Sequence, residues 1–146
     1  MPKSRMTTAD VAAQVSCLRK RLCGMRLANV YDDSAKVFTL KLARSGENNE
    51  KIVLLMESGA RFHTTQVQTE RASNDVPGNF TMKLRKHLRT RRLSDIRQLG
   101  MDRIVDFVFG SGDGEHHLIL ELYSQGNVVL TDKEYVVLSL LRSHRD

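Results

Sequence analysis

Residues 100–109 read Gly-Met-Asp-Arg-Ile-Val-Asp-Phe-Val-Phe, and this stretch says most about the fold of the chain. From position 105 onward every second residue is large and apolar, namely Val105, Phe107 and Phe109. A period of two is typical of a strand with one buried and one exposed face. Gly100 permits a sharp turn just before it, so Asp102 and Arg103 are expected at a fixed position where the strand begins.

Strand-like runs continue on both sides of this stretch. They lie at 25–31, 37–42, 52–56, 61–65, 93–99, 116–123 and 127–130. Segments rich in turn-forming residues, such as 110–114 and 124–126, separate the later runs. A final apolar run at 135–141 fits a strand or a short helix. Short strands joined by tight turns predict an antiparallel arrangement.

Two amphipathic helices are expected beside these strands. Thr7 and Asp10 form a helix-start signal, and apolar residues then recur at helical spacing as far as Gly24. After a polar surface loop at 66–79, Asn79 is expected to cap a second helix whose apolar stripe is Phe80, Leu84 and Leu88. The predicted fold class is therefore α+β, an antiparallel β-sandwich with flanking helices.

Composition narrows the class of protein. The 146 residues suit one domain with a substantial core, and the net charge of +6 favours an acidic partner such as nucleic acid. Cys17 and Cys23 lie six apart on a predicted helix and are not expected to bridge each other. Since no run is long enough to span a membrane and no signal peptide begins the chain, we expect a cytoplasmic protein, with the nucleus left open.

A dense cationic segment lies upstream of the opening stretch. Six of the ten residues from 83 to 92 are cationic: Lys83, Arg85, Lys86, Arg89, Arg91 and Arg92. A charge run is usually only a solvated face. Six like charges without intervening acids repel one another, however, and this is better explained by facing phosphates. We therefore predict that these six side chains contact a nucleic-acid backbone.

Asp102 and Arg103 form a second candidate site, to which Asp10 is added. Arg103 suits bidentate contact with a phosphate or a base edge, and Asp102 suits a role in orienting it. Structural alternatives stay open for both parts of this site. Asp102 and Arg103 would also make an ordinary surface ion pair, and Asp10 would stabilise the first turn of its helix.

The segment Arg-Phe-His-Thr-Thr at 61–65 is a third candidate. Arg61 and His63 would contact RNA there, through phosphates or stacked bases. An ordinary strand end with Phe62 in the core is an equal alternative.

Catalytic and metal-binding patterns are weak. His116 and His117 are adjacent on a predicted strand, so their side chains face opposite ways and do not form one metal site. The sequence contains no paired-cysteine zinc pattern, phosphate-binding glycine loop or nucleophile elbow. Pro2 would offer a Schiff-base amine once Met1 is removed, but an ordinary N-terminus is the simpler interpretation. No catalytic residue, metal or cofactor is predicted.

Several segments, in order, resemble the N-terminal domain of the NFACT family, especially its eukaryotic members of the NEMF and Caliban type. The most specific are Glu-Ser-Gly-Ala-Arg-Phe-His-Thr-Thr at 57–65 and Gly-Met-Asp-Arg-Ile-Val-Asp-Phe at 100–107. The others lie at 3–5, 29–32, 82–88 and 121–132. The resemblance implies that residues 1–146 are one such domain of a longer protein. It also implies a fold similar to the N-terminal domain of formamidopyrimidine-DNA glycosylases.

The resemblance also implies a function in ribosome-associated quality control. Family members bind the large ribosomal subunit and tRNA, recruit charged tRNA, with alanine in eukaryotes, for message-independent C-terminal tailing, and support a listerin-type E3 ligase. The family's functional residues correspond here to Asp10, Asp102 and Arg103. They are implied to engage tRNA without breaking bonds, so the domain alone is expected to be non-catalytic.

Two other functions are kept as alternatives. A DNA-binding or glycosylase-like repair domain would use Pro2, but Lys3 stands where those enzymes have a glutamate. A protein-interaction module would bind listerin or another factor, and that binding would survive high salt.

Overall fold

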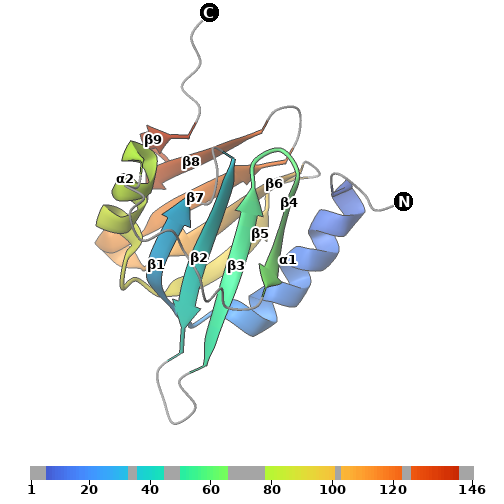
Figure 1. Ribbon diagram of the computed structural model, residues 1–146, viewed down its shortest axis with the longest axis horizontal. Coiled ribbons are helices and arrows are strands. Elements are labelled where there is room, and N and C mark those ends of the chain that lie inside the picture. The colour runs from blue at the N-terminus through green and yellow to red at the C-terminus, as the bar shows by residue number, and fades with distance from the viewer. Residues whose placement is uncertain are drawn as a thin grey trace, which may run out of the picture.

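The structure, a computed structural model, describes residues 6–32, 36–44, 50–65, 78–100, 103–122 and 126–141. Figure 1 shows the helices and strands of this part of the chain. They are α1 (Thr8–Leu22), β1 (Arg26–Asp32), β2 (Val37–Ala43), β3 (Lys51–Glu57), β4 (Arg61–Thr65), α2 (Asn79–Leu88), β5 (Leu93–Gln98), β6 (Ile104–Phe109), a 3-10 turn (Gly112–Gly114), β7 (His116–Glu121), β8 (Asn127–Asp132) and β9 (Val137–Leu140).

The strands form two antiparallel sheets, in the orders β1-β2-β3-β4 and β5-β6-β7-β8-β9. In Figure 1 the two sheets are layered, and the helices lie on opposite sides of them. Helix α1 contacts β5, whereas α2 contacts both β1 and β9. The expected α+β class, with antiparallel sheets and two helices, is confirmed.

One hydrophobic core fills the space between the sheets. Alternate residues of both sheets and one face of each helix contribute to it. Phe62 of β4 meets Phe107 of β6 edge to face across this core, with ring centroids 5.7 Å apart. Helix α1 buries Val11, Val15, Leu18 and Leu22, at the spacing read from the sequence.

The two helices begin in different ways. In α1, Thr7 Oγ1 accepts the Asp10 N–H at 3.1 Å, and Asp10 Oδ2 accepts the Thr7 N–H at 2.9 Å. The prediction that Asn79 caps α2 is wrong, because Gly78 is the N-cap and Asn79 is the first helical residue. Asp32 at the end of β1 replaces a local cap, since its Oδ2 accepts hydrogen bonds from Gly78 N and Thr81 Oγ1 at 2.8 Å each.

The predicted strands are found with small shifts of their ends, and the final apolar run contains β9. The half-buried character expected of β6 is wrong. Asp106 and Val108 alternate with the core residues of β6, on the face expected to be exposed. Both are buried, at 0% and 4% exposure. Cys17 and Cys23 are free thiols, as expected. The loop predicted at 66–79 lies mostly outside the described residues.

A junction between the two sheets holds the start of β6. The Gly59 N–H donates to Glu121 O at 3.0 Å, and the Leu122 N–H donates to Arg103 O at 2.8 Å. Gly126 has φ +75°, and a Cβ on it would overlap the backbone of Gly59. Only glycine allows this close approach, which fixes the backbone of Arg103 against the first sheet.

Candidate nucleic-acid interface

The cationic segment 83–92 is divided between a helix and a turn. Helix α2 ends at Leu88, so Arg89, Arg91 and Arg92 lie beyond the helix. The chain reverses at Thr90, which has φ +71°, and Arg92 then bridges to Arg26 as the second sheet begins. Pairing with β1 ends the helix, because the Thr90 N–H, which would otherwise continue it, donates to Leu27 O at 2.8 Å.

The arginines here are held by backbone carbonyls. Arg85 donates from Nε and Nη2 to Val30 O at 2.9 and 2.8 Å, and Arg91 Nε donates to His87 O at 2.7 Å. Arg26, which the sequence analysis did not single out, donates to Thr90 O at 3.0 Å. Arg89 Nε lies 3.3 Å from Ala28 O. We call Arg26 together with the six predicted cations the basic face.

Four arginines elsewhere in the described residues pair with carboxylates. Arg19 contacts Asp95, Arg44 contacts Glu50, Arg61 contacts Glu57 and Arg97 contacts Asp106. A carbonyl orients a guanidinium without cancelling its charge, whereas a carboxylate does both. The basic face therefore keeps its positive charge available to a polyanion.

Exposure separates the cations of the basic face into two groups. Arg85 and Arg91 are half-buried, and the Arg85 guanidinium also lies 5.6 Å from the centroid of the Tyr31 ring. These two side chains mainly fix α2 and the following turn. The exposed cations are Arg26, Lys83, Lys86, Arg89 and Arg92.

A cavity of about 380 Å³ lies between α1 and β4. We call it the Met6 pocket; it is lined by Met6, Asp10, Ala13, Gln14, Arg61, Phe62 and His63. Gln14 Nε2 donates to Phe62 O at 3.0 Å, which ties the helix to the strand. Phe62 itself is fully buried, as the structural alternative for this segment required. The pocket nevertheless brings together three predicted site residues, Asp10, Arg61 and His63.

Arg103 lies beside this pocket. Its Nη1 is 3.5 Å from Met6 O, at the outer limit of a hydrogen bond, and its side chain is half-buried. Asp102, expected to orient it, lies outside the described residues. Asp10 serves as a capping residue, as its structural alternative proposed, and it also lines the pocket. The joint role of these three residues stays a prediction.

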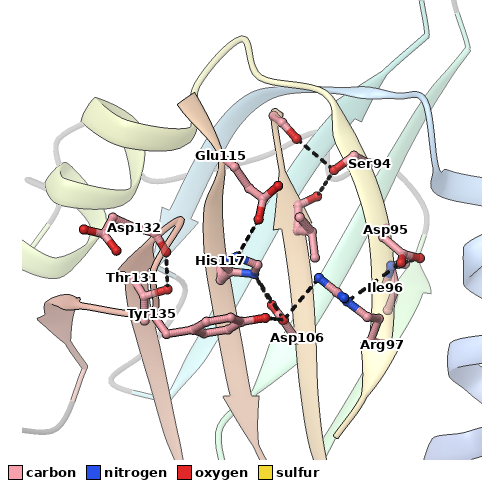
Figure 2. Close-up of polar contacts among 12 residues, drawn as sticks. Ser94, Asp95, Ile96, Arg97, Asp106, Glu115, His117, Thr131, Asp132 and Tyr135 are labelled. Carbon is pink, nitrogen blue, oxygen red and sulfur yellow. Dashed lines mark hydrogen bonds and ion pairs between the residues drawn. The ribbon is translucent and has the colours of Figure 1, made fainter. Parts of the chain in front are cut away.

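Sequence reasoning missed a buried polar cluster on the outer face of the second sheet (Figure 2). His117 Nδ1 lies 2.9 and 3.1 Å from the two carboxylate oxygens of Asp106, and Tyr135 Oη donates to Asp106 Oδ2 at 2.7 Å. His117 Nε2 is 2.9 Å from Glu115, and the Tyr135 ring stacks on the imidazole at 4.1 Å. The only signal in the sequence was an acidic residue at the middle of an apolar strand.

We call Asp106, His117, Glu115, Tyr135 and Arg97 the Asp106 cluster. Burial, with the neighbouring Asp106 carboxylate, raises the pKa of Tyr135 to about 12. His116 points away from this cluster, as expected of adjacent strand residues, with its Nδ1 2.9 Å from Gly114 O. Within the described residues no group of three or more His, Cys, Asp or Glu side chains is placed to hold a metal ion.

The chain was compared with known proteins. A family model described as the NFACT N-terminal and middle domains matches residues 7–146. The chain belongs to the NFACT family. It is 49% identical over 144 residues to the human ribosome quality control complex subunit NEMF and 46% identical to the Drosophila melanogaster homologue. These matches cover 99% of this chain but only 13% and 14% of the relatives, so this NFACT chain spans about an eighth of their length.

A solved structure shares the fold of this NFACT chain. The N-terminal domain of the fibronectin-binding protein PavA from Streptococcus pneumoniae matches with a TM-score of 0.82 at 23% identity, over 95% of this chain and 56% of that one. At this identity the likeness concerns the fold alone. The expected similarity to glycosylases stays a prediction. No helix in the described part of the chain is long and apolar enough to cross a membrane.

Proposed function

We propose that this chain is an RNA-binding N-terminal domain of a cytoplasmic ribosome quality-control factor. It binds tRNA and the large ribosomal subunit and, within the longer protein, supports tailing with alanine-charged tRNA and a listerin-type E3 ligase. The observation that carries the proposal is the basic face, whose exposed cations meet no carboxylate among the described residues. Family membership and 49% identity to a ribosome quality control subunit support it.

Two parts of the surface have different tasks in this proposal. The basic face contacts phosphates and positions the RNA without reading its sequence. Asp10, Asp102 and Arg103 engage tRNA more specifically, with Arg61 and His63 at the adjoining Met6 pocket. Neither part breaks a bond, so the domain acts as a non-catalytic adaptor.

Fluorescence anisotropy tests the binding step. The 146-residue chain is titrated with folded tRNA and with duplex DNA of matched length, each at several salt concentrations. We expect tRNA to bind more tightly than DNA, with an affinity that falls steeply as salt rises. Equal binding to both would leave a nonspecific cationic surface, and a preference for duplex DNA would favour the repair-domain alternative.

The specific part is tested in the longer protein. Arg103→Ala is expected to reduce tail addition strongly while changing overall tRNA affinity little, because it removes one oriented contact and leaves the basic face intact. Unchanged tailing would contradict the role of Arg103. Salt-resistant binding to the E3 ligase without any RNA binding would favour the protein-interaction alternative.

A further inference from the structure

Two histidines from distant parts of the sequence meet at the edge of the basic face. The ring of His87 on α2 lies 5.2 Å from the ring of His116 on β7, centroid to centroid, with the planes tilted by 37°. Both side chains are half-buried. His116 Nδ1 is 2.9 Å from Gly114 O, so this nitrogen carries a proton and its Nε2 is left as an acceptor. The His87 ring makes no hydrogen bond to any described residue.

Cations dominate the surroundings of this pair. Burial, followed by the positive charges of His116, Lys86, Lys83 and Arg91, lowers the pKa of His87. Arg91 approaches from the turn after α2 and packs against Gly114. One acid of this region is Asp132 on β8, which pairs in register with His116. Its carboxylate already accepts the N–H groups of Glu134 and Val136.

The two other carboxylates of this region are also engaged. Asp113 pairs with Lys133, and Glu115 faces His117 on the opposite side of β7. The charge of Asp132 acts on His116, but the His87 ring is surrounded by cations, so a positive charge on that ring costs stability. A bound anion would remove that cost.

We propose that His87 and His116 form a phosphate-binding element that takes up a proton when RNA binds. This inference rests on the proposed function and names a contact within it. A backbone phosphate beside the rings supplies the missing negative charge, so a proton from solvent adds to one imidazole and gives it a second N–H donor. The two rings are too close to charge independently, so the first proton is shared by the pair as a unit. The ligand is the phosphodiester of RNA, and no bond is broken.

Proton uptake predicts a defined pH dependence. The association constant for tRNA should rise as pH falls, by up to about tenfold per pH unit for each proton taken up. The rise should level off at low pH, where the free pair already carries its proton. Anisotropy titrations of the 146-residue chain with tRNA between pH 5.5 and 8, at constant ionic strength, measure this profile.

Two substitutions separate charge from packing. His87→Gln combined with His116→Gln should flatten the pH profile, because it removes the rise in affinity between pH 8 and pH 5.5. His87→Lys should give binding at pH 8 close to that of the wild type at pH 5.5, because its charge is permanent. Calorimetry of the unsubstituted chain, in two buffers of different ionisation enthalpy, counts the protons directly and does not depend on any variant folding.

The outcomes distinguish the two proposals. Binding of tRNA with equal heats in both buffers, or with the same pH profile in the wild type and the double glutamine variant, would overturn the histidine element and leave the proposed function standing. No tRNA binding at any pH or salt concentration would overturn the proposed function itself. Proton uptake that disappears in the double variant would support both.

Discussion

The basic face and the Asp106 cluster both concentrate charged side chains, but they treat charge in opposite ways. In the Asp106 cluster the groups meet one another, and Asp106 and His117 are almost completely withdrawn from solvent. In the basic face the guanidinium groups meet backbone carbonyls, and most of the cations reach solvent. Charged groups that pair with one another inside the protein are not available to a partner. Cations that are oriented by carbonyls and exposed to solvent remain able to bind one.

The contrast also explains the positions of two strained residues. The described non-glycine residues with positive φ are Thr90, in the turn beside the basic face, at +71°, and Tyr135, in the Asp106 cluster, at +65°. Each stands where a side chain or carbonyl has to be aimed. The Thr90 carbonyl accepts a hydrogen bond from the Arg26 guanidinium, and the Tyr135 hydroxyl donates one to the Asp106 carboxylate. Backbone strain therefore occurs in both regions, where it directs a carbonyl toward Arg26 in one and a hydroxyl toward Asp106 in the other.

Removing the buried carboxylate should have the largest effect on stability. Asp106→Ala leaves His117, Tyr135 and Arg97 without their common partner, and breaking such a buried arrangement costs about 3 kcal/mol of unfolding free energy. Urea denaturation followed by circular dichroism measures this loss. The matched control is Asp113→Ala, because Asp113 makes an ion pair with Lys133 while its side chain is 99% exposed.

The control should change the free energy of unfolding by no more than about 0.5 kcal/mol. Equal costs for the two aspartates would show that Asp106 is not held as a buried, paired carboxylate. tRNA binding by the folded fraction of Asp106→Ala should remain normal, because the cluster lies outside the basic face.

Charge reversal in the basic face should weaken RNA binding and leave stability nearly unchanged, the opposite of Asp106→Ala. Arg89→Glu combined with Arg92→Glu should weaken tRNA binding by roughly tenfold or more and reduce the slope of log affinity against log salt by about 2. Stability should change little, since both side chains are exposed. Anisotropy across a salt series provides both numbers.

A matched control applies the same change of charge to a different surface. Lys41 and Lys51 share the outer face of the first sheet, as the register of β2 and β3 shows. If Lys41→Glu with Lys51→Glu weakened binding as much as the variant of Arg89 and Arg92, total charge rather than the basic face would explain the affinity.

Tyr135→Phe should remove one hydrogen bond from the Asp106 cluster while keeping the stacked ring. Because the ring is partly exposed, we expect a loss of only about 1 kcal/mol at neutral pH. The raised pKa of Tyr135 means that its stabilising effect is complete below pH 10 and is lost as pH rises toward 12. Absorbance titration at alkaline pH should show that Tyr135→Phe removes a late-titrating tyrosine that is present in the wild type.

The sequence was a good guide to elements whose signals are local. Apolar spacing and the capping box located α1, and alternation located the strands. It failed where a partner comes from far along the chain. Gly78 begins α2 because Asp32, 46 residues earlier, supplies the hydrogen bonds that Asn79 was expected to make.

The same limit applies to the candidate sites. Composition identified the cations at 83–92, but only the structure separates Arg85 and Arg91, which fix the backbone, from the exposed ones. Alternation placed Asp106 on an exposed face, whereas Tyr135, from the connection between β8 and β9 and 29 residues later, covers it. The Met6 pocket brings together Asp10, Arg61 and His63, which the sequence placed in separate candidate sites, because α1 packs against β4.

The smallest expected effect concerns strain in the turn of the basic face. Thr90→Gly removes a β-branched residue from a left-handed conformation, which is worth about 1–2 kcal/mol, and the greater freedom of glycine in the unfolded chain offsets roughly half of this. A net gain of about 0.5–1 kcal/mol in unfolding free energy should result, because the two backbone hydrogen bonds of this residue, to Leu27 O and from Arg26, need no side chain. Binding of tRNA should stay unchanged. A more stable protein that binds less tightly would mean instead that the stiffness of the turn, and not only its geometry, orients Arg89 and Arg92 toward phosphate.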